Sequence, residues 1–537
     1  MDRGLASFVD GKLTRSAMDT NLSINYNGPD ELAAVGSLGI WALLDSYYVR
    51  TTLWLLVSPW ILSSSLAFIV LVTKTIPDIL RRKTISMRLP QSAWIIHGKK
   101  YDLSAWVKDH PGGEWAIELG RNRDCTGLFE SYHIFADRAK LEKILARFEI
   151  KDEAAPDVIP DENWAKVGSS QSENSKDGLF FNDAFHEDVK QLLKTHFKKT
   201  GSRKMKTWVG SLMALLIAFE VYLAYLFFQG STIAIFLLPT IGWLLCCNLA
   251  HDGSHFAVSE RPWINRLASY AGMPLFFPST CWHIQHVVQH HVYTNDHDDV
   301  DLYHFLPVCR ASRFTQWTSQ YHFQWLAIFF ILPTTVGHLL IIVPLDVLSK
   351  QVDMITGKRR YWQCQNLEDF VSRFSTRIFL ELMYCVGFYF LSCYFQGFAE
   401  GSRRAFMVFS IASFWFIVIT QGAHLQRDCM VGKEDKYQSW AKRQSATSVN
   451  FRPDSYFWLI FTGALNIQSL HHVVPCVGSS QLIDIYPEYK QICAKHGVPL
   501  KEVKSLLEFF KGFLGWIQEL AYEEEESQSK TRKAKHH

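Results

Sequence analysis

The sequence has almost no net charge: its 537 residues include 55 Lys and Arg against 52 Asp and Glu, which leaves +3. Such a balance provides no positive field for binding nucleic acid. The 11 cysteines form no Cys-x-x-Cys pair, so neither a thiolate zinc site nor a disulfide framework is predicted. No solenoid-length repeat is visible. No Gly-x-Gly-x-x-Gly stretch follows a strand, so the chain is not expected to bind a nicotinamide nucleotide itself.

What the sequence does contain is a set of long apolar runs between charged segments. Hydrophobic residues make up 48% of the chain, the pattern of a membrane protein with sizeable soluble parts. About 20 apolar residues in a helix span the ~30 Å hydrocarbon core of a bilayer. Four core transmembrane helices in two hairpins are predicted. Their stretches are 208–228, 231–250, 376–395 and 405–422.

Two further apolar stretches differ from these four. Residues 51–72 carry no charge and precede a basic cluster, so an extra N-terminal transmembrane helix is predicted, with a hairpin or interfacial segment as the alternative. Residues 325–345 contain Pro333 and other residues poorly suited to lipid, which favours an interfacial or re-entrant segment. The basic loop 346–375 indicates the cytosolic side. The resulting topology places three regions in the cytosol: 84–205, 251–375 and 423–537.

A pair of histidines between the first apolar run and the first hairpin points to a haem. His110 opens the turn His110-Pro-Gly-Gly, and His133 follows 23 residues later. Two neutral imidazoles can ligate a haem iron from opposite faces, and such a haem transfers electrons without binding oxygen. Residues 84–150, with Asp124-Cys-Thr-Gly-Leu-Phe, resemble the cytochrome b5 family. The resemblance implies haem b with His110 and His133 as its axial ligands.

Three short clusters of histidines lie just outside the predicted spans. On a helix, residues three or four apart share a face, so each cluster can present two or three imidazoles to one point. Seven histidines and one glutamine in these clusters are enough to hold two metal ions. The clusters are His251-Asp-Gly-Ser-His255, His286-Val-Val-Gln-His290-His291 and Gln468-Ser-Leu-His471-His472.

Ligation by imidazole without thiolate suits iron, copper or zinc. A haem that delivers single electrons beside a two-metal site argues for redox chemistry and therefore for iron. A zinc transporter is the competing class of histidine-rich membrane protein. Its ligands would be expected within the spans, along the substrate path, and a transporter has no evident use for a haem domain.

The three clusters resemble the histidine boxes of the membrane fatty-acid desaturase family, over about residues 84–515. The fused cytochrome b5-like domain and Gln468 resemble its front-end branch. The resemblance implies two iron ions and a further ligand, His424, from the exit of the last span, while Gln468 would ligate directly or through water. His283 is a weaker candidate. The implied metal ligands are His251, His255, His286, His290, His291, His424, Gln468, His471 and His472.

The predicted fold is an α+β cytochrome b5-like domain fused to an all-α membrane domain, whose four core helices carry a cytosolic histidine-rich cap. An acidic run, Asp296–Asp301, follows the second cluster, and the favoured interpretation is that it is solvated rather than that it tunes the site. The expected organisation is a polar tail and membrane anchor over 1–83, a haem domain over 84–150, a linker over 151–205, a membrane di-iron domain over 206–515 and a charged tail over 516–537.

The resemblance implies an oxygen-dependent acyl desaturase of polyunsaturated fatty acid biosynthesis. It would insert a cis double bond into an unsaturated long-chain fatty acyl lipid or acyl-CoA, between an existing double bond and the carboxyl end. No catalytic residue beyond the metal ligands is expected. Electrons would pass from NADH through a separate cytochrome b5 reductase to the haem and then to the iron site, where O2 is reduced.

Two alternatives remain open, besides the transporter. A sphingolipid long-chain-base desaturase or a fatty-acyl hydroxylase would keep the same fold, because the same oxidant can return oxygen to the substrate. A haem-bearing electron carrier with an inactive desaturase part belongs to another class, and the intact histidine clusters argue against it. The C-terminal Lys533-Ala-Lys-His-His537 resembles the dilysine retrieval signal of endoplasmic reticulum membrane proteins. The implied location is that membrane, with haem domain and histidine boxes facing the cytosol.

Overall fold

The computed structural model describes residues 92–151, 183–349, 367–430 and 439–534, together with Phe181. Five single positions are excepted: His297, Asp298, His304, Pro307 and Gln316. The predicted N-terminal span over 51–72, the first residues of the haem domain and most of the linker lie outside the described residues.

The described part of the haem domain is a small sheet with short helices on it. Strand β1 pairs antiparallel with β2 and parallel with β3, in the order β2-β1-β3. His97 and Gly98, both with positive φ, make the tight turn between β1 and β2. Trp94 and Phe129 belong to the apolar core. The elements are β1 (Trp94–Ile96), β2 (Lys99–Tyr101), α4 (Glu114–Glu118), β3 (Arg123–Asp124), α5 (Thr126–Tyr132) and α6 (Arg138–Leu145).

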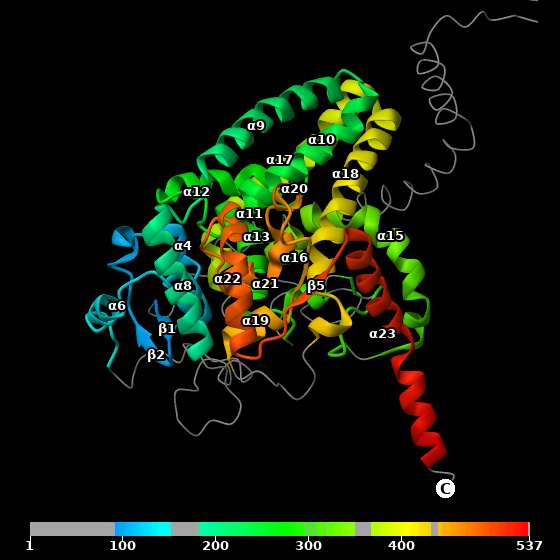
Figure 1. Ribbon diagram of the computed structural model, residues 1–537. Coiled ribbons are helices and arrows are strands. Elements are labelled where there is room, and N and C mark those ends of the chain that lie inside the picture. Colours follow the sequence, from blue (N-terminus) through cyan, green and yellow to red (C-terminus); the bar gives the residue numbers. More distant parts are fainter. Residues whose placement is uncertain are drawn as a thin grey trace, which may run out of the picture. The chain divides into compact units, whose positions relative to one another are not determined.

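Four long apolar helices form two hairpins (Figure 1). Gly230 lies in the turn of the first hairpin and Gly397 in the turn of the second. Their φ values, 87° and 80°, are ones that a residue with a side chain rarely adopts. The four predicted core spans are thereby found, each end within nine residues of the predicted one. The helices are α9 (Thr207–Phe228), α10 (Thr232–Leu245), α17 (Leu367–Gln396) and α18 (Phe398–Thr420).

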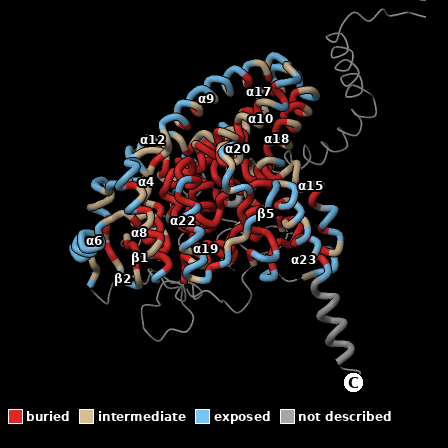
Figure 2. Tube along the Cα trace, in the orientation of Figure 1, coloured by how far each residue is buried: buried red, intermediate tan, exposed pale blue. Residues whose placement is uncertain are grey.

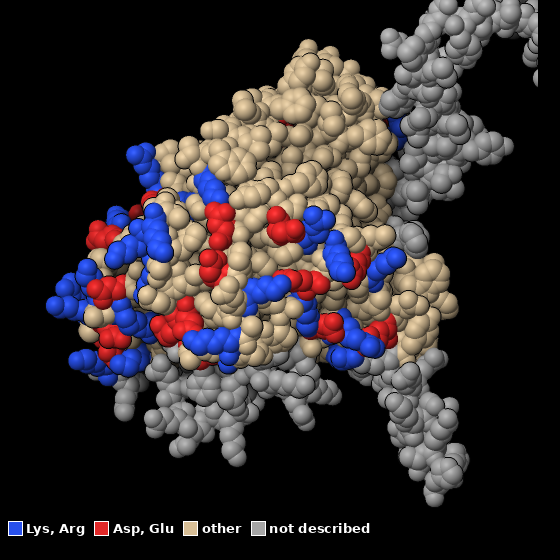
Figure 3. Space-filling model, in the orientation of Figure 1, with Lys and Arg blue, Asp and Glu red and all other residues tan. Residues whose placement is uncertain are grey.

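The spans differ in how much of their surface the protein covers. Only 17% of the apolar window of Thr207–Phe228 is buried, against 67% for Thr232–Ser254 and for Phe398–Ala423. Helix α9 is accordingly exposed along most of its length in Figure 2. Around these helices the surface carries almost no charge, whereas the rest of the visible face is densely charged (Figure 3). This segregation is what a bilayer requires of a spanning segment.

The apolar stretch predicted to be interfacial or re-entrant is sharply bent. The segments Ser319–Leu326 and Ile331–Leu345 meet at 94°, the geometry of a broken span or a re-entrant loop. Helix α15 (Gln324–Gly337) packs against α18, and α23 (Leu506–Ala534) packs against α15.

The cap beyond the spans is assembled from segments far apart in the sequence. An extended apolar cluster joins α8, near the end of the predicted linker, to α22 and to the helix that carries the third histidine box. Figure 2 shows this buried centre below the spans. The principal elements are α8 (Ala184–Thr200), α19 (Trp440–Ala446), β4 (Val449–Phe451), α20 (Tyr456–Thr462), α21 (Gln468–Val473), α22 (Leu482–Lys495) and β5 (Lys501–Val503).

Candidate active site

The two histidines predicted to hold haem face each other across a cavity. The ring centroids of His110 and His133 are 6.1 Å apart. Nδ1 of His133 lies 2.8 Å from the carbonyl of Phe129, and Nδ1 of His110 lies 3.3 Å from that of Gly113. With the proton on Nδ1 in each ring, Nε2 is left as the donor atom for a metal. A Cβ on Gly112 would come within 2.9 Å of the His110 ring, so the second residue after this histidine has to be small.

This cavity suits a flat apolar group with iron at its centre. Its volume is about 410 Å³, and its walls include Leu103, Trp106 and Phe129. Burial, together with the neighbouring His133, lowers the pKa of His110 to about 4. Both rings are therefore neutral ligands at physiological pH, as haem ligation requires.

Five buried histidines from three separate elements form the first histidine group. Their nearest ring nitrogens all lie within 4.8 Å of one another. The first box continues the second span through a π-helical turn at Cys246–Ala250 into α11 (His251–Ser254). The other members come from the second and third boxes. The group consists of His251, His255, His286, His291 and His471.

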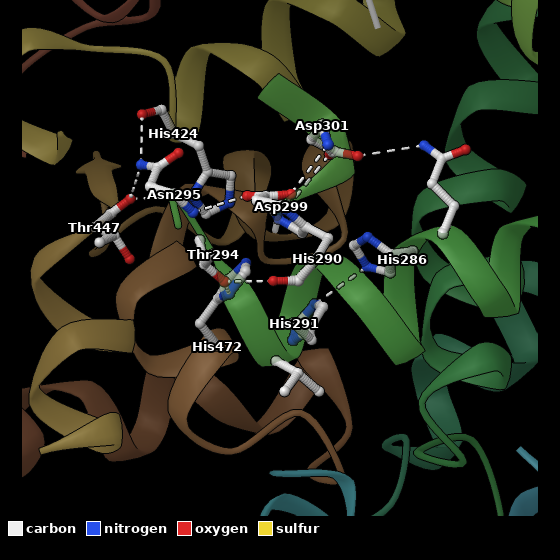
Figure 4. Close-up of polar contacts among 12 residues, drawn as sticks. His286, His290, His291, Thr294, Asn295, Asp299, Asp301, His424, Thr447 and His472 are labelled. Carbon is white, nitrogen blue, oxygen red and sulfur yellow. Dashed lines mark hydrogen bonds and ion pairs between the residues drawn. The ribbon is translucent and has the colours of Figure 1, made fainter. Parts of the chain in front are cut away.

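The second box is wound as a π-helix, which changes the partners of its histidines. The π-helical turn runs over His283–His290 and leads into α14 (His291–Tyr293). In a π-helix the residue five positions on comes to the same face. Nε2 of His286 accordingly lies 3.2 Å from Nε2 of His291, as Figure 4 shows. The rings of His286 and His290 still lie on one face, with centroids 5.5 Å apart and an interplanar angle of 20°, but His286 shares its nearest nitrogens with His291.

His290 instead belongs to the second histidine group, with His424 and His472. The side-chain amide nitrogen of Gln468 lies 2.8 Å from Nε2 of His424 and 3.0 Å from Nε2 of His472. The oxygen and the nitrogen of a glutamine amide can exchange places by rotation of the side chain, and the neighbouring groups decide which of them faces the two histidines. Beside a bound cation, the amide oxygen of Gln468 would face the ion. All eight predicted histidines, with Gln468, are thus brought together in two adjacent groups. His283 joins neither group.

Two acidic residues hold His290: Asp299, which is buried, and Asp301, which is partly exposed. Both carboxylate oxygens of Asp299 lie 3.1 Å from its Nδ1, and Asp301 lies 3.5 Å away (Figure 4). Burial alone would lower the pKa of His290, but the two carboxylates outweigh it and raise the pKa to about 9. The interpretation of this acidic run as solvated is wrong for Asp299, which is fully buried. A carboxylate behind a histidine makes the ring a stronger metal donor.

Other polar residues that the histidine spacing gave no role support the second group. Thr294 Oγ1 and Gln444 Oε1 lie 3.0 Å and 3.1 Å from Nδ1 of His472. Asn295 donates from Nδ2 to the backbone carbonyl of His424 at 3.1 Å. Thr294 and Asn295 directly follow the second box, but only the tertiary contacts assign them a function.

The first group has the donor chemistry of a metal site. Among the described residues, ring nitrogens of His251, His255, His291 and His471 are buried without a hydrogen-bond partner. Leaving buried polar atoms unpaired costs about 1–3 kcal/mol each, and a bound cation removes that cost. Imidazoles without thiolate fit iron, so the residues present suit the predicted ion.

A small apolar cavity of about 30 Å³ reaches the histidines from the spans. Its lining includes Trp243, Phe277 and Phe416, together with His251 of the first histidine group and His290 of the second. Apolar side chains of the spans and both histidine groups therefore border one space.

Comparisons with known proteins agree with this geometry. Residues 230–504 match the fatty acid desaturase family, and residues 83–152 match the cytochrome b5-like haem/steroid binding domain. An acyl-lipid omega-13 desaturase of Chlamydomonas reinhardtii is 32% identical over 79% of this chain and 92% of its own. An acyl-lipid (8-3)-desaturase of Physcomitrium patens is 27% identical over 79% and 86%. Human fatty acid desaturase 3 is 27% identical over 78% and 87%.

The family match covers α10, the second hairpin and all three boxes, and the second match covers both haem histidines. The chain therefore belongs to the fatty acid desaturase family and is an oxidoreductase that carries its own cytochrome b5-like domain.

Proposed function

We propose that this desaturase inserts a cis double bond into a long-chain acyl group of a membrane lipid, between an existing double bond and the carboxyl end. The observation that carries the proposal is that residues of both histidine groups line one small apolar cavity with side chains of the spans. Relatives described as acyl-lipid (8-3)-desaturases and Delta(5) desaturases support the carboxyl-side position. The product would serve polyunsaturated fatty acid biosynthesis.

In this proposal the first histidine group holds one iron ion, and the second holds another with Gln468. Bound iron would supply the oxidising power that removes two hydrogens from neighbouring methylenes while O2 is reduced to water. The residues of the chain position those ions and exclude water: the histidines through their fixed rings, and Trp243, Phe277 and Phe416 through the apolar wall beside them.

Electron supply is assigned to the haem domain, with His110 and His133 as axial ligands of haem b. NADH and a separate cytochrome b5 reductase would reduce it. With the two helical hairpins as the only spans of this domain, both ends of the catalytic cap would lie on one side of the membrane. The proposed location is the endoplasmic reticulum membrane with that side facing the cytosol, an orientation that the basic loop 346–375 supports.

A second candidate is favoured by the 32% identical relative, whose name counts the new double bond from the methyl end. An enzyme that positions the double bond from the carboxyl end and one that positions it from the methyl end differ in one measurable way. When the acyl chain is lengthened, the first keeps the distance to the carboxyl group and the second keeps the distance to the methyl group.

The test is the acyl and sphingoid-base profile of yeast that expresses the protein and is fed unsaturated acids differing in length by two carbons. A new double bond at constant distance from the carboxyl carbon is expected, recovered first in membrane lipid rather than in acyl-CoA. His472→Ala is the matched inactive control. A bond that follows the methyl end would replace the carboxyl-side assignment, and a hydroxylated or sphingoid product would replace the reaction or the substrate.

A further inference from the structure

The phenol of Tyr132 joins the haem domain to the first histidine group. Its oxygen lies 2.7 Å from Nδ1 of His255, across 123 residues of sequence. The two rings are nearly parallel, with an interplanar angle of 14°. Phe256 packs edge-on against the same tyrosine. A metal-site histidine of the membrane domain is therefore held from outside that domain.

The other end of Tyr132 reaches the haem cavity. Tyr132 is the last residue of α5, and a peptide bond connects it to His133. Both residues line the cavity. Nδ1 of His133 donates a hydrogen bond to the carbonyl of Phe129, so Nε2 is available for the haem iron. From one predicted ligand to the other, the connection consists only of covalent bonds and one hydrogen bond.

The protonation of His255 fits this connection. Its Nε2 has no hydrogen-bond partner among the described residues and belongs to the group that could hold a metal. A neutral ring that gives Nε2 to a metal carries its proton on Nδ1, and it donates that proton to the Tyr132 oxygen. For His290 the equivalent position behind the ring is filled by Asp299. For His255 the position behind the ring is occupied by Tyr132 of the haem domain.

Close packing keeps this contact in place. A Cβ on Gly127, in the same helix as Tyr132, would come within 2.6 Å of the Val292 side chain. A Cβ on Gly113 would come equally close to Pro262. Arg373 also pairs with Glu118 of the haem domain. The two regions approach nearer than side chains at these glycines would allow.

We propose that Tyr132 is the bridge through which electrons pass from the haem to the metal site, and that it positions His255 for this purpose. The inference rests on the proposed di-iron function. Electronic coupling falls off more slowly through bonds and hydrogen bonds than across a gap, so this route is favoured. Each turnover oxidises the ferrous haem twice. The two electrons, two protons and two substrate hydrogens convert O2 into two water molecules, and the phenol keeps its proton.

A second contact between the same regions offers a rival route and a control. The Trp115 ring of the haem domain lies 5.2 Å from the His283 ring. Among the described residues, Trp115 Nε1 and His283 Nε2 have no hydrogen-bond partner, so this contact is through space. Trp115→Phe changes an aromatic residue at the same interface without touching the proposed bridge.

The experiment uses the full-length holoenzyme in lipid nanodiscs: wild type, Tyr132→Phe and Trp115→Phe. Haem and non-haem iron are counted first. Fully reduced enzyme is then mixed rapidly with O2 and an unsaturated acyl lipid that is a substrate of the wild type, with a substrate-free control. The first turnover uses electrons already at the metal site, and haem absorbance then reports their replacement. Tyr132→Phe should form the first product normally but oxidise its haem at least about tenfold more slowly, while Trp115→Phe stays near wild type.

Each other result overturns the inference in a distinct way. Haem oxidation at the wild-type rate in a fully loaded Tyr132→Phe enzyme shows that the hydrogen bond is not the route. Loss of iron and of the first-turnover product in that variant shows a purely structural role. If Trp115→Phe slows haem oxidation as much as Tyr132→Phe does, the cause is disturbed packing between the haem domain and the membrane domain, not the loss of the hydrogen bond. If the wild type forms no product and shows no substrate-dependent haem oxidation, the di-iron function itself fails.

Discussion

Asp299 meets His290 with both carboxylate oxygens, each 3.1 Å from Nδ1 of the imidazole. The same carboxylate accepts hydrogen bonds from the backbone nitrogens of Asn295 at 2.7 Å and of Asp301 at 3.0 Å. It is therefore fixed in direction as well as buried. A carboxylate held in this way orients the ring and raises the basicity of the nitrogen that faces a metal.

Asp299→Asn is accordingly expected to lower desaturation by about 10–100-fold. The amide is a weaker acceptor than the carboxylate and leaves N–H groups unpaired in a buried position. Product formation and non-haem iron per haem measure the effect. Asp454→Asn is the control, because the Asp454 side chain is 76% exposed and pairs with Arg452. Normal turnover in Asp299→Asn would remove Asp299 from the metal site.

Gln468→Ala should reduce the iron content of the second histidine group and spare the haem. The Gln468 amide is the group that lies between the facing Nε2 atoms of His424 and His472. Its loss removes one donor and opens space for water. Elemental analysis for iron, combined with the haem absorbance, measures both cofactors in one sample. Gln191→Ala, on the exposed face of α8, should change neither, and unchanged non-haem iron in Gln468→Ala would argue against ligation by Gln468.

Gly127→Ala should leave haem binding intact and slow turnover. The added Cβ would lie 2.6 Å from Cγ1 of Val292, so the contact between the haem domain and the second box has to widen. The helix itself gains up to about 1 kcal/mol of propensity, so local unfolding is not expected. Desaturation rate per bound haem is the measurement.

Val292→Ala removes the methyl group that Gly127→Ala would meet. The double variant should therefore recover part of the lost rate, giving a coupling between the two sites that independent residues do not show. Strictly additive losses in the two variants would contradict the close approach.

Glu130 should stabilise the haem domain in a pH-dependent way. Burial opposes its charge, but hydrogen bonds from His97 and Arg138, each 2.7 Å long, outweigh burial and lower its pKa from 4.5 to about 2. Because the folded-state pKa is below the unfolded-state value, the contribution is complete above about pH 4.5 and is lost as the pH falls to about 2.

Glu130→Gln should therefore reduce the free energy of unfolding by about 1–3 kcal/mol at pH 7. Thermal melting followed by haem absorbance measures this, and the difference from wild type should shrink as the pH approaches 2. Glu142→Gln is a matched control, since Glu142 faces the same Arg138 at 3.6 Å with 69% of its side chain exposed. Identical melting of Glu130→Gln and wild type at pH 7 would contradict the assignment.

Local patterns in the sequence predicted the parts that depend on short-range order. Apolar run length located the four spans, because a helix must be long and uncharged to cross a bilayer. Prolines within 325–345 predicted a departure from a straight span, and the bend of 94° agrees. Paired histidines at helical spacing located the three boxes, and the fold brings all of them together.

The division of the boxes into two groups was beyond such patterns. Sequence spacing assumes an α-helix, whereas the second box is π-helical and places His291, rather than His290, in the first group with His286. Asp299 was misinterpreted because a run of acidic residues is most often solvated, and nothing in the run itself reveals burial against His290. Tyr132 and His255 are 123 residues apart, so only tertiary structure connects them.

The contact between Gly127 and Val292 has a kinetic consequence. A donor that is packed against its acceptor within one polypeptide delivers electrons by a first-order process, with no collision between molecules. The rate of that step does not change when the enzyme is diluted in the membrane. Competition among other enzymes for a shared, diffusing electron carrier would not limit it either. Under the proposed electron supply, only the encounter with the reductase would then depend on concentration.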